Sequence, residues 1–450
     1  MLKGEVFMKK LFTSFLSVIF LISIILAGCS NSSGTETANS DSGSGSKSED
    51  VVTLSFMGWE ASPLETESVK KGLEKFMKEN PGIKVEYTPV PGEQYSSKLI
   101  TMMAGNSAPD VFFVYADQYR DLVNRGTLLE LTPKLDDEIA LEDFIPSSQS
   151  IMDVDGKVYG ISSTTVSPVL FYNKKIFDEA GIEYPSSNPT ESWTWEEFVD
   201  VAEKLTIKEG KDIKQYGAYG LEILGSTTAL LRNNGAAFLN EDGSVALNNA
   251  EAKEGLEAIR KLREDGITPA AQTLENSGMS APQMLQTGKI GMMIEGSWAL
   301  QQLATMGFPV GVAPLPKFGS EPSTHGSAHL HSASANTKHP EEAWKLIKFL
   351  SSEDYQNQLI KEGLWMPNRV DMYSEEGVKA WYDSEVHPEG FLEMNSFFKD
   401  AEAYPFVTIQ KYVIQDIVSE EFEKYYNGDQ NVDDTLSKID TRVTEELARK

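Results

Sequence analysis

Residues 51–57 read VVTLSFM, residues 83–87 read IKVEY and residues 111–114 read VFFV. Each is a short run rich in β-branched and aromatic residues, which is typical of a β-strand. Between the first two runs, apolar residues recur at the spacing of a helix face: Val69, Leu73, Phe76 and Met77. The sequence Asn-Pro-Gly at 80–82 ends this helix. Strands that alternate with helices predict an α/β fold with a largely parallel sheet.

Two later helices carry equally clear signals. Thr194 and Glu197 have the spacing of a capping box, followed on one face by Phe198, Val201, Ala202 and Leu205. Pro340 suits a first helical turn, ahead of an apolar stripe formed by Ala343, Leu346, Ile347 and Leu350. A chain of 450 residues is too long for one core, so we expect two domains or lobes.

The chain is strongly acidic. It has 40 Lys and Arg against 68 Asp and Glu, which gives a formal net charge of −28 at pH 7. Such a surface repels phosphate backbones and anionic lipid headgroups. Nucleic acid is therefore not an expected partner, and solubility is the simplest explanation of the excess charge.

The first 28 residues have the features of a secretory signal peptide. Lys9 and Lys10 precede an uncharged, mostly apolar run over 11–27. The sequence Leu-Ala-Gly-Cys then ends at Cys29, the only cysteine, and resembles a bacterial lipobox, in which the cysteine is lipidated and becomes the mature N-terminus. An uncleaved membrane helix over 11–27 is the alternative. The sequence leaves open whether translation starts at Met1 or Met8.

Residues 29–50 are expected to form the lipidated Cys29 and a flexible linker. The linker is almost entirely small or polar and cannot bury enough surface to fold. From Val51 onward no segment is apolar enough to span a bilayer, so the chain is not itself a transport channel. We expect a globular body tethered at the outer face of the cell membrane, extracellular in a Gram-positive-type bacterium and periplasmic otherwise.

Several blocks of sequence occur in a recognisable order. They are APDVFF (108–113) with Asp117, GTLLELTP (126–133), YGI (159–161), LFYNK (170–174), FDEAGI (177–182), WTWEEF (193–198), GKIGMMIEGSWAL (288–300), HPEEAW (339–344) and VDDTL (432–436). Together they resemble the family 1 extracellular solute-binding proteins, and the resemblance runs from about residue 51 to the end of the chain.

This resemblance implies an α/β, two-lobed fold of the periplasmic-binding-protein type (type II), with a ligand cleft between the lobes. The first lobe would comprise 51–162 and 314–363, and the second 163–313 and 364–450. It implies the substrate-binding subunit of an ABC importer, which closes on a carbohydrate by a hinge and delivers it to a membrane permease. We expect an oligosaccharide ligand, a monomer and no cofactor.

Candidate ligand contacts follow two predicted strands. In α/β sheets, ligand clefts open at the carboxyl ends of strands. Trp59 and Glu60 follow the first strand, and Tyr115 and Asp117 follow the strand 111–114. A sugar site needs aromatic platforms beside hydrogen-bonding carboxylates, which these residues supply. The alternatives are that Trp59 covers the core and that Asp117 caps the next helix.

The resemblance adds further candidates. Trp298 matches a tryptophan that stacks on a sugar ring, and Asp117 matches a position that hydrogen-bonds sugar. Trp365 and Arg369 lie in a segment that resembles a cleft rim, although Arg369 could form a plain surface salt bridge or suit an acidic sugar. Glu222 is a further candidate. Val166 stands where maltodextrin-binding members have a sugar-binding Glu, so the sequence departs from that specificity.

Three of the five histidines fall within seven residues: His325, His329 and His331. Alternate residues of a strand share one face, so these rings could bind zinc with a carboxylate, contact a ligand in the cleft, or play a structural part. We take His329 as the ligand-contact candidate and expect no bound metal.

Two other functional classes remain as alternatives. A glycoside hydrolase needs two carboxylates placed across one bond, and the sequence singles out no such pair. There is no G-x-S-x-G, H-E-x-x-H or phosphate loop, and a lipidated Cys29 leaves no catalytic thiol. We therefore expect no enzyme activity. A receptor of the same fold for a metal or another non-sugar solute is the second alternative. The sequence does not specify the sugar, its length or linkage, or the permease.

Overall fold

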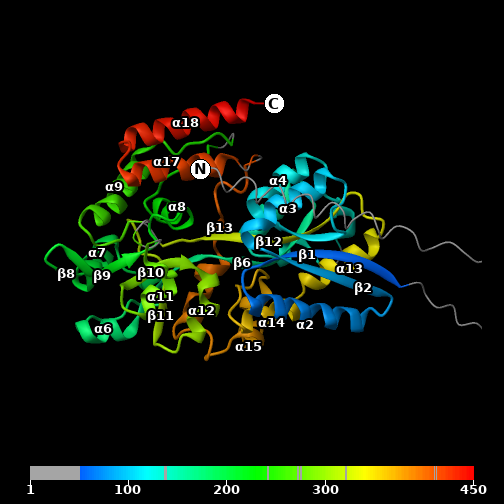
Figure 1. Cartoon of the computed structure of the whole chain (residues 1–450), viewed down its shortest axis with the longest axis horizontal. Helices are drawn as coiled ribbons and strands as arrows, with labels where there is room; N and C mark the ends of the chain where they lie inside the picture. Colours follow the sequence, from blue (N-terminus) through cyan, green and yellow to red (C-terminus); the bar gives the residue numbers. More distant parts are fainter. Residues whose placement is uncertain are drawn as a thin grey trace, which may run out of the picture. The chain divides into compact units, whose positions relative to one another are not determined.

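The computed structural model describes residues 51–135, 139–240, 243–270, 273, 276–319, 322–409, 411 and 413–449. The predicted signal peptide, Cys29 and the predicted linker lie outside these residues. Helices pack around two β-sheets (Figure 1). No helix in the described part of the chain is both long and apolar enough to cross a membrane.

The first sheet contains six strands: β1 (Val52–Glu60), β2 (Ile83–Pro91), β3 (Val111–Tyr115), β6 (Gly160–Val166), β12 (His325–Ala333) and β13 (Glu402–Ala403). Their order is β13-β12-β3-β1-β2, and β6 also pairs with β12. Strands β1, β2 and β3 are parallel, as the sequence predicts. The prediction of a largely parallel sheet does not extend to β12, which runs antiparallel to β3 and β6 because the chain re-enters this sheet from the second one.

The second sheet has the order β11-β7-β10-β9-β8. Its strands are β7 (Pro168–Asn173), β8 (Ile207–Glu209), β9 (Asp212–Tyr219), β10 (Ile290–Gly296) and β11 (Val310–Ala313). Only β9 and β10 are parallel, and the other pairings are antiparallel. A short hairpin, β4 (Asp153–Val154) with β5 (Lys157–Val158), stands apart from both sheets. The chain first passes between the sheets at Ser167, which lies between β6 and β7.

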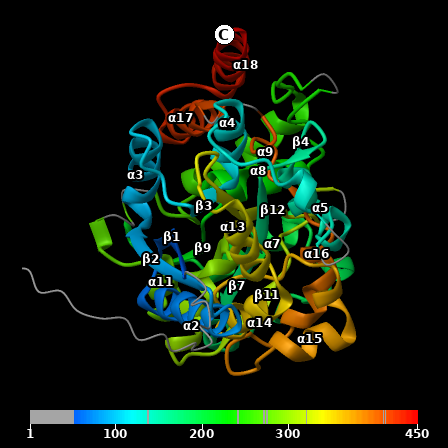
Figure 2. The same cartoon turned by 90° about the vertical axis from the view of Figure 1, so that its right-hand side faces the viewer.

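The helices around the first sheet are α2 (Pro63–Glu79), α3 (Gly92–Ala104), α4 (Ala116–Asn124), α5 (Pro146–Met152), α13 (Pro340–Leu350), α14 (Glu353–Lys361) and α15 (Glu375–Trp381). Figure 1 shows α3 and α4 above this sheet and α2 and α14 below it. Helix α13 packs on β1, β3, β6 and β12 and lies in front of them in Figure 2. Cover on both faces explains why the VFFV run of β3 is fully buried, as its composition predicts.

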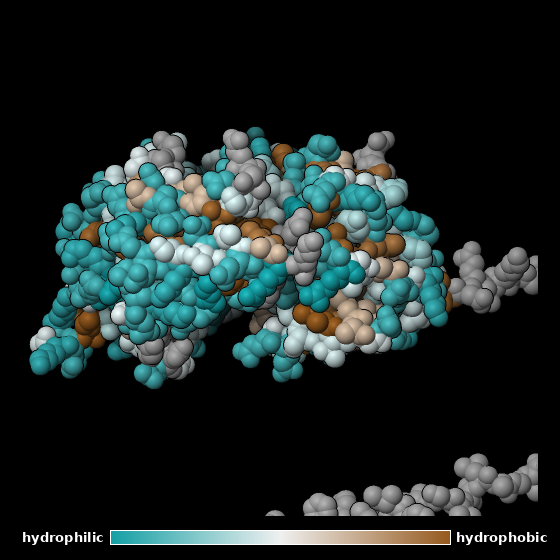
Figure 3. All heavy atoms as spheres, turned by 90° about the horizontal axis from the view of Figure 1, so that it is seen from above, coloured by the Kyte–Doolittle hydropathy of each residue, from teal (hydrophilic) through white to brown (hydrophobic). Residues whose placement is uncertain are grey.

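The helices in the part of the chain that forms the second sheet are α6 (Lys174–Ala180), α7 (Trp195–Leu205), α8 (Leu224–Asn233), α9 (Ala250–Glu264), α11 (Ala281–Gln286) and α12 (Leu300–Thr305). Of these, α7, α8 and α11 pack on strands of the second sheet, and α9 packs on α8. The C-terminal part adds α16 (Asn395–Lys399), α17 (Val413–Asn427) and α18 (Val432–Ala448). Residues after 363 pack on elements around both sheets, because α18 packs on α9 whereas β13 pairs with β12 and α15 packs on α14. The face seen in Figure 3 is largely hydrophilic, as expected of so acidic a chain.

Helix α7 begins with the predicted capping box. The hydroxyl of Thr194 accepts a hydrogen bond from the Glu197 amide (3.2 Å), and the Glu197 carboxylate accepts one from the Thr194 amide (2.8 Å). These reciprocal bonds satisfy two amides that a helix start leaves without partners. The apolar stripe at Phe198, Val201 and Leu205 is buried, so both sequence predictions for this helix are confirmed.

Replacing Thr194 should lower stability by a small, measurable amount. Thr194→Ala removes the side-chain acceptor at the helix start, and we expect the free energy of unfolding to fall by about 1 kcal/mol in urea unfolding. Glu203→Ala, at an exposed position of the same helix, is the control and should leave stability nearly unchanged. Equal effects of the two substitutions would contradict a capping role for Thr194.

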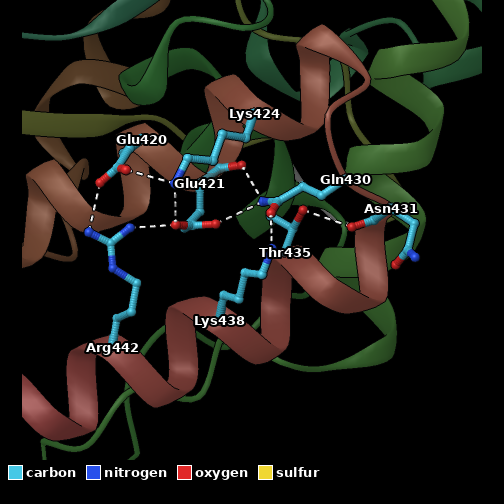
Figure 4. Close-up of polar contacts among 8 residues, drawn as sticks. All are labelled: Glu420, Glu421, Lys424, Gln430, Asn431, Thr435, Lys438 and Arg442. Carbon is cyan, nitrogen blue, oxygen red and sulfur yellow. Dashed lines mark hydrogen bonds and ion pairs between the residues drawn. The ribbon is translucent and has the colours of Figure 1, made fainter.

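A polar cluster joins α17 to the turn and helix that follow it (Figure 4). The carboxylate of Glu421 accepts hydrogen bonds from Lys424 (2.9 Å), Gln430 (2.9 Å) and Arg442. Glu420 pairs with the same two cations, Lys424 and Arg442, both at 2.7 Å. The side chain of Glu421 is only 2% exposed and that of Glu420 is 49% exposed, so one carboxylate is enclosed by the cluster and the other lies at its surface.

Candidate functional site

A cavity of about 1010 Å³ is lined by residues from both sheets. This volume is at the upper limit of the ~300–1,000 Å³ typical of small-molecule sites, so it exceeds what a single sugar ring needs. Its lining includes side chains from strand ends, helix starts and the C-terminal part: Trp59, Ser62, Tyr115, Asp117, Val166, Glu295, Trp298, Gln301, Thr305, His325, His329, Trp365 and Tyr404. We call this space the main cavity.

The first-sheet wall of the main cavity is aromatic. Trp59, at the end of β1, stacks on Phe113 with ring centroids 5.2 Å apart and an interplanar angle of 15°. Its edge contacts are with Tyr115 at 4.8 Å and His329 at 5.3 Å. Trp365 meets the other side of His329 at 5.1 Å. Four predicted candidates, Trp59, Tyr115, His329 and Trp365, therefore lie together in one packed wall of rings.

Trp298 offers a free aromatic surface on the opposite side. It lies in the short 3-10 helix Ser297–Ala299 that follows β10, lines the main cavity and is 45% exposed. Its ring lies over the backbone of Gly296, where an added Cβ would be only 2.0 Å from a ring carbon. Gly296 thus makes room for this ring position. A large exposed aromatic side chain at a cavity is suited to stacking on an apolar ligand face.

Two carboxylates also line the main cavity. Asp117 lies in the first turn of α4, and its buried Oδ1 atom has no hydrogen-bond partner among the residues that the structure describes. Burial raises the pKa of Asp117 to about 6, and the negative charge of Asp416 adds to this shift. Burial also raises the pKa of Glu295, at the end of β10, although its carboxylate accepts a hydrogen bond from the Gly296 amide (3.0 Å). The unsatisfied oxygen of Asp117 can accept a hydrogen bond from a ligand hydroxyl.

The three clustered histidines are distributed between the main cavity and a small neighbouring one. His325 and His329 line the main cavity, whereas His331 lines a much smaller cavity of about 20 Å³ among aromatic rings. Burial lowers the pKa of each ring to about 3, so all three are neutral at pH 7. Among the residues that the structure describes, no group of three or more His, Cys, Asp or Glu could hold a metal ion.

Three sequence candidates lie outside the main cavity. Glu60 accepts a hydrogen bond from Thr66 (2.8 Å) at the start of α2. Glu222 forms an ion pair with Arg263 (3.0 Å) and lines a second cavity of about 270 Å³.

Arg369, the third of these candidates, is enclosed by two carboxylates and a ring: Asp143 and Asp371, both at 3.5 Å, and Phe144 at 5.5 Å. The structure therefore does not bring these three side chains together with the others.

Several polar residues that line the main cavity were not predicted from the sequence. Glu295 lies at the end of strand β10, so the strand-end rule that selected Asp117 could have selected it too. Ser62 and Gln301 belong to different sides of the cavity and hydrogen-bond to each other (2.7 Å). Tyr404 reaches the cavity from a segment beside β13, and no local signal in the sequence indicates this. Val166 also lines the cavity, so the position that departs from maltodextrin-binding members is apolar here.

The sequence and the fold are similar to those of known proteins. A family model described as bacterial extracellular solute-binding protein matches residues 62–357. The chain belongs to this family. Among the curated relatives of this solute-binding protein, the galactooligosaccharide-binding protein of Bacillus subtilis is 29% identical over 343 residues, which cover 74% of each chain. A putative binding protein of Brucella abortus is 26% identical over 368 residues, covering 80% of this chain and 84% of the relative.

Solved structures share the fold. An ABC substrate-binding protein of Listeria monocytogenes in complex with cycloalternan superposes with a TM-score of 0.76 and 24% identity, over 89% of this chain and 100% of that one. A maltose-bound MalE3 of T. maritima gives a TM-score of 0.73 and 23% identity, over 88% of this chain and 100% of that one. The predicted two-lobed binding-protein fold and the family resemblance are thereby confirmed.

Proposed function

We propose that this solute-binding protein is the substrate-binding subunit of an ABC importer and captures an oligosaccharide in the main cavity. One observation carries the proposal: an exposed Trp298 ring and a packed aromatic wall border the same large cavity as the unsatisfied Asp117 carboxylate. Sugar rings have apolar faces and hydroxyl rims, which suit aromatic platforms and hydrogen-bond acceptors respectively. The relatives named for galactooligosaccharides, and the neighbours bound to cycloalternan and maltose, support the same ligand class.

In this proposal the two lobes are 51–162 with 314–363 and 163–313 with 364–450, and they close on the sugar by a hinge. Each lobe is built mainly on one of the two sheets, although the last residues of β6 and the strand β13 lie beyond the bounds of the first lobe and still pair in its sheet. The ligand can drive closure only if it binds the closed state more tightly than the open state. The closed monomer delivers its ligand to a membrane permease and carries out no chemistry on it. Cleavage of the signal peptide before Cys29 and lipidation of this residue would hold the protein at the outer face of the cell membrane.

Thermal unfolding with a panel of neutral mono- and oligosaccharides, and with zinc as a separate additive, tests the function. A ligand at a hundred times its dissociation constant stabilises the folded state by about 2.7 kcal/mol, which raises the melting temperature measurably. We expect a shift with one class of oligosaccharide and none with zinc. A zinc shift without any saccharide shift would contradict the proposal and favour a metal receptor.

Trp298→Ala should weaken binding of the oligosaccharide found in this panel by about five- to tenfold, corresponding to a loss of ~1 kcal/mol of stacking. Isothermal titration calorimetry measures the change. Tyr184→Ala is the matched control, because Tyr184 is a similarly exposed aromatic residue (41%) that does not line the main cavity. If both variants bound with unchanged affinity, Trp298 would not be a sugar platform.

A further inference from the structure

We infer from the charges around the main cavity that its ligand is a saccharide without anionic groups, and that the site excludes uronic acids and sulfated or phosphorylated sugars. This inference rests on the function proposed above and narrows its substrate class. The observations that carry it are the nature of the charged residues in the cavity wall and the partners of the basic residues nearby.

Among the described residues, the charged side chains of the cavity wall are all acidic. Asp117 lies on the first-sheet side and Glu295 at the end of β10, so carboxylates border the cavity from both sheets. None of the described residues that line the cavity is Lys or Arg. Hydrogen-bond donors alone would leave the charge of a buried ligand anion unpaired beside two carboxylates, and the described lining residues supply no cation.

Arginines on nearby segments are occupied by carboxylates. Arg232, on the helix whose first residues line the cavity, pairs with Glu402. Arg369 follows the cavity residue Trp365 in sequence but is held by Asp143 and Asp371. To pair with an anionic group of a ligand, either guanidinium would have to break its present ion pair. The carboxylates that it now neutralises would then be left without a partner.

The histidines do not replace the missing cations. His325 and His329 are the remaining basic side chains of the wall among the described residues, and both are buried. Burial lowers the pKa of each to about 3, so neither carries a positive charge near pH 7. A ligand carboxylate would therefore meet two like charges and no opposite one. The net charge of −28 would also slow the approach of an anionic ligand.

A matched pair of ligands tests the inference. One is the neutral oligosaccharide with the largest thermal shift in the panel, and the other is the same oligosaccharide with one hydroxymethyl group oxidised to a carboxylate. We expect the oxidised sugar to bind at least tenfold more weakly at pH 7.5, measured by titration calorimetry. The sulfated form of the same oligosaccharide should be excluded to a similar extent.

Two variants distinguish exclusion of the oxidised sugar by charge from exclusion by shape. Glu295→Gln keeps the size of the side chain and removes a negative charge, so the affinity ratio of neutral to oxidised sugar should fall several-fold. Thr305→Lys adds a cation at an exposed position of the cavity rim and should lower the same ratio further. A ratio unchanged in both variants would show that the exclusion is steric and would overturn the inference.

The outcomes also distinguish this inference from the proposed function. If the oxidised or sulfated sugar bound as tightly as the neutral one, the inference would be wrong and the sugar-receptor function would stand. If anionic saccharides alone bound, the inference would again be wrong. If no saccharide of either kind bound, the proposed function would fail and the inference with it.

Discussion

Asp117→Asn should stabilise the ligand-free protein at pH 7.5 and weaken its affinity for the oligosaccharide by about 10- to 100-fold. A hydrogen bond to a charged group contributes ~1.5–3 kcal/mol, and the amide keeps the shape of the carboxylate while losing its charge. The same change relieves the cost of burying an ion that has no partner for its Oδ1 atom in the free protein. Opposite changes in stability and affinity are typical of a residue kept for binding.

The pH dependence of this effect has a definite sign. The pKa of Asp117 rises from 3.8 to about 6 on folding, because burial disfavours the ionised form. The folded state therefore holds the proton more tightly than the unfolded state does. The stability from this group is fully present below about pH 4 and is lost as the pH rises through about 6, a change of about 3 kcal/mol. The stability advantage of Asp117→Asn should thus be largest above pH 7 and small at pH 4.

Melting temperatures of the free proteins between pH 4 and 8, together with titration calorimetry at pH 7.5, check both parts of this prediction. Asp121→Asn is the matched control, because Asp121 lies one turn further along α4, pairs with Arg125 (2.8 Å) and does not line the main cavity. It should leave the affinity unchanged. An Asp117→Asn protein that melts at a lower temperature and binds with normal affinity would make Asp117 a structural residue.

Local signals in the sequence predicted the parts of the fold that depend on neighbouring residues. The capping box at Thr194 and the buried stripe after it involve residues within one or two turns, so spacing alone sufficed. The parallel order of β1, β2 and β3 followed from strands that alternate with helices. The antiparallel entry of β12 could not be predicted in this way, because its partners β3 and β6 lie more than 150 residues away in the chain.

The candidate site, like the fold, was predictable from the sequence only where it depends on neighbouring residues. The strand-end rule correctly placed Trp59, Tyr115 and Asp117 at the wall of the main cavity. It succeeded because the end of a strand can be located from the sequence, and clefts open at strand ends. The rule does not predict which way a side chain at a strand end points. Glu222 occupies a comparable position after β9 but turns toward Arg263, which lies 41 residues further along the chain. Likewise, Tyr404 reaches the cavity only because β13 pairs with β12.

Glu421→Ala should lower the free energy of unfolding by about 2–4 kcal/mol. Burial alone would raise the pKa of Glu421, but hydrogen bonds from Lys424, Gln430 and Arg442 outweigh it and the pKa is lowered. Removing this carboxylate takes one acceptor from each of three donors at the join between α17 and α18 (Figure 4). Loss of one partner of a buried ion pair costs ~3–5 kcal/mol. The cost is smaller here, since Lys424 and Arg442 are partly exposed and retain Glu420.

Glu420→Ala is the control that isolates burial. It removes a carboxylate that pairs with the same Lys424 and Arg442 but is 49% exposed, so we expect a loss below ~1 kcal/mol. Urea unfolding of both variants gives the two free energies.

The carboxylate of Glu421 also has a lowered pKa, so the stability it provides is present at neutral pH and is lost as the pH falls through that lowered value. Accordingly, the difference between Glu421→Ala and the unmodified chain should shrink in acid. Equal losses from Glu420→Ala and Glu421→Ala at pH 7.5 would mean that burial of Glu421 adds nothing to its ion pairs.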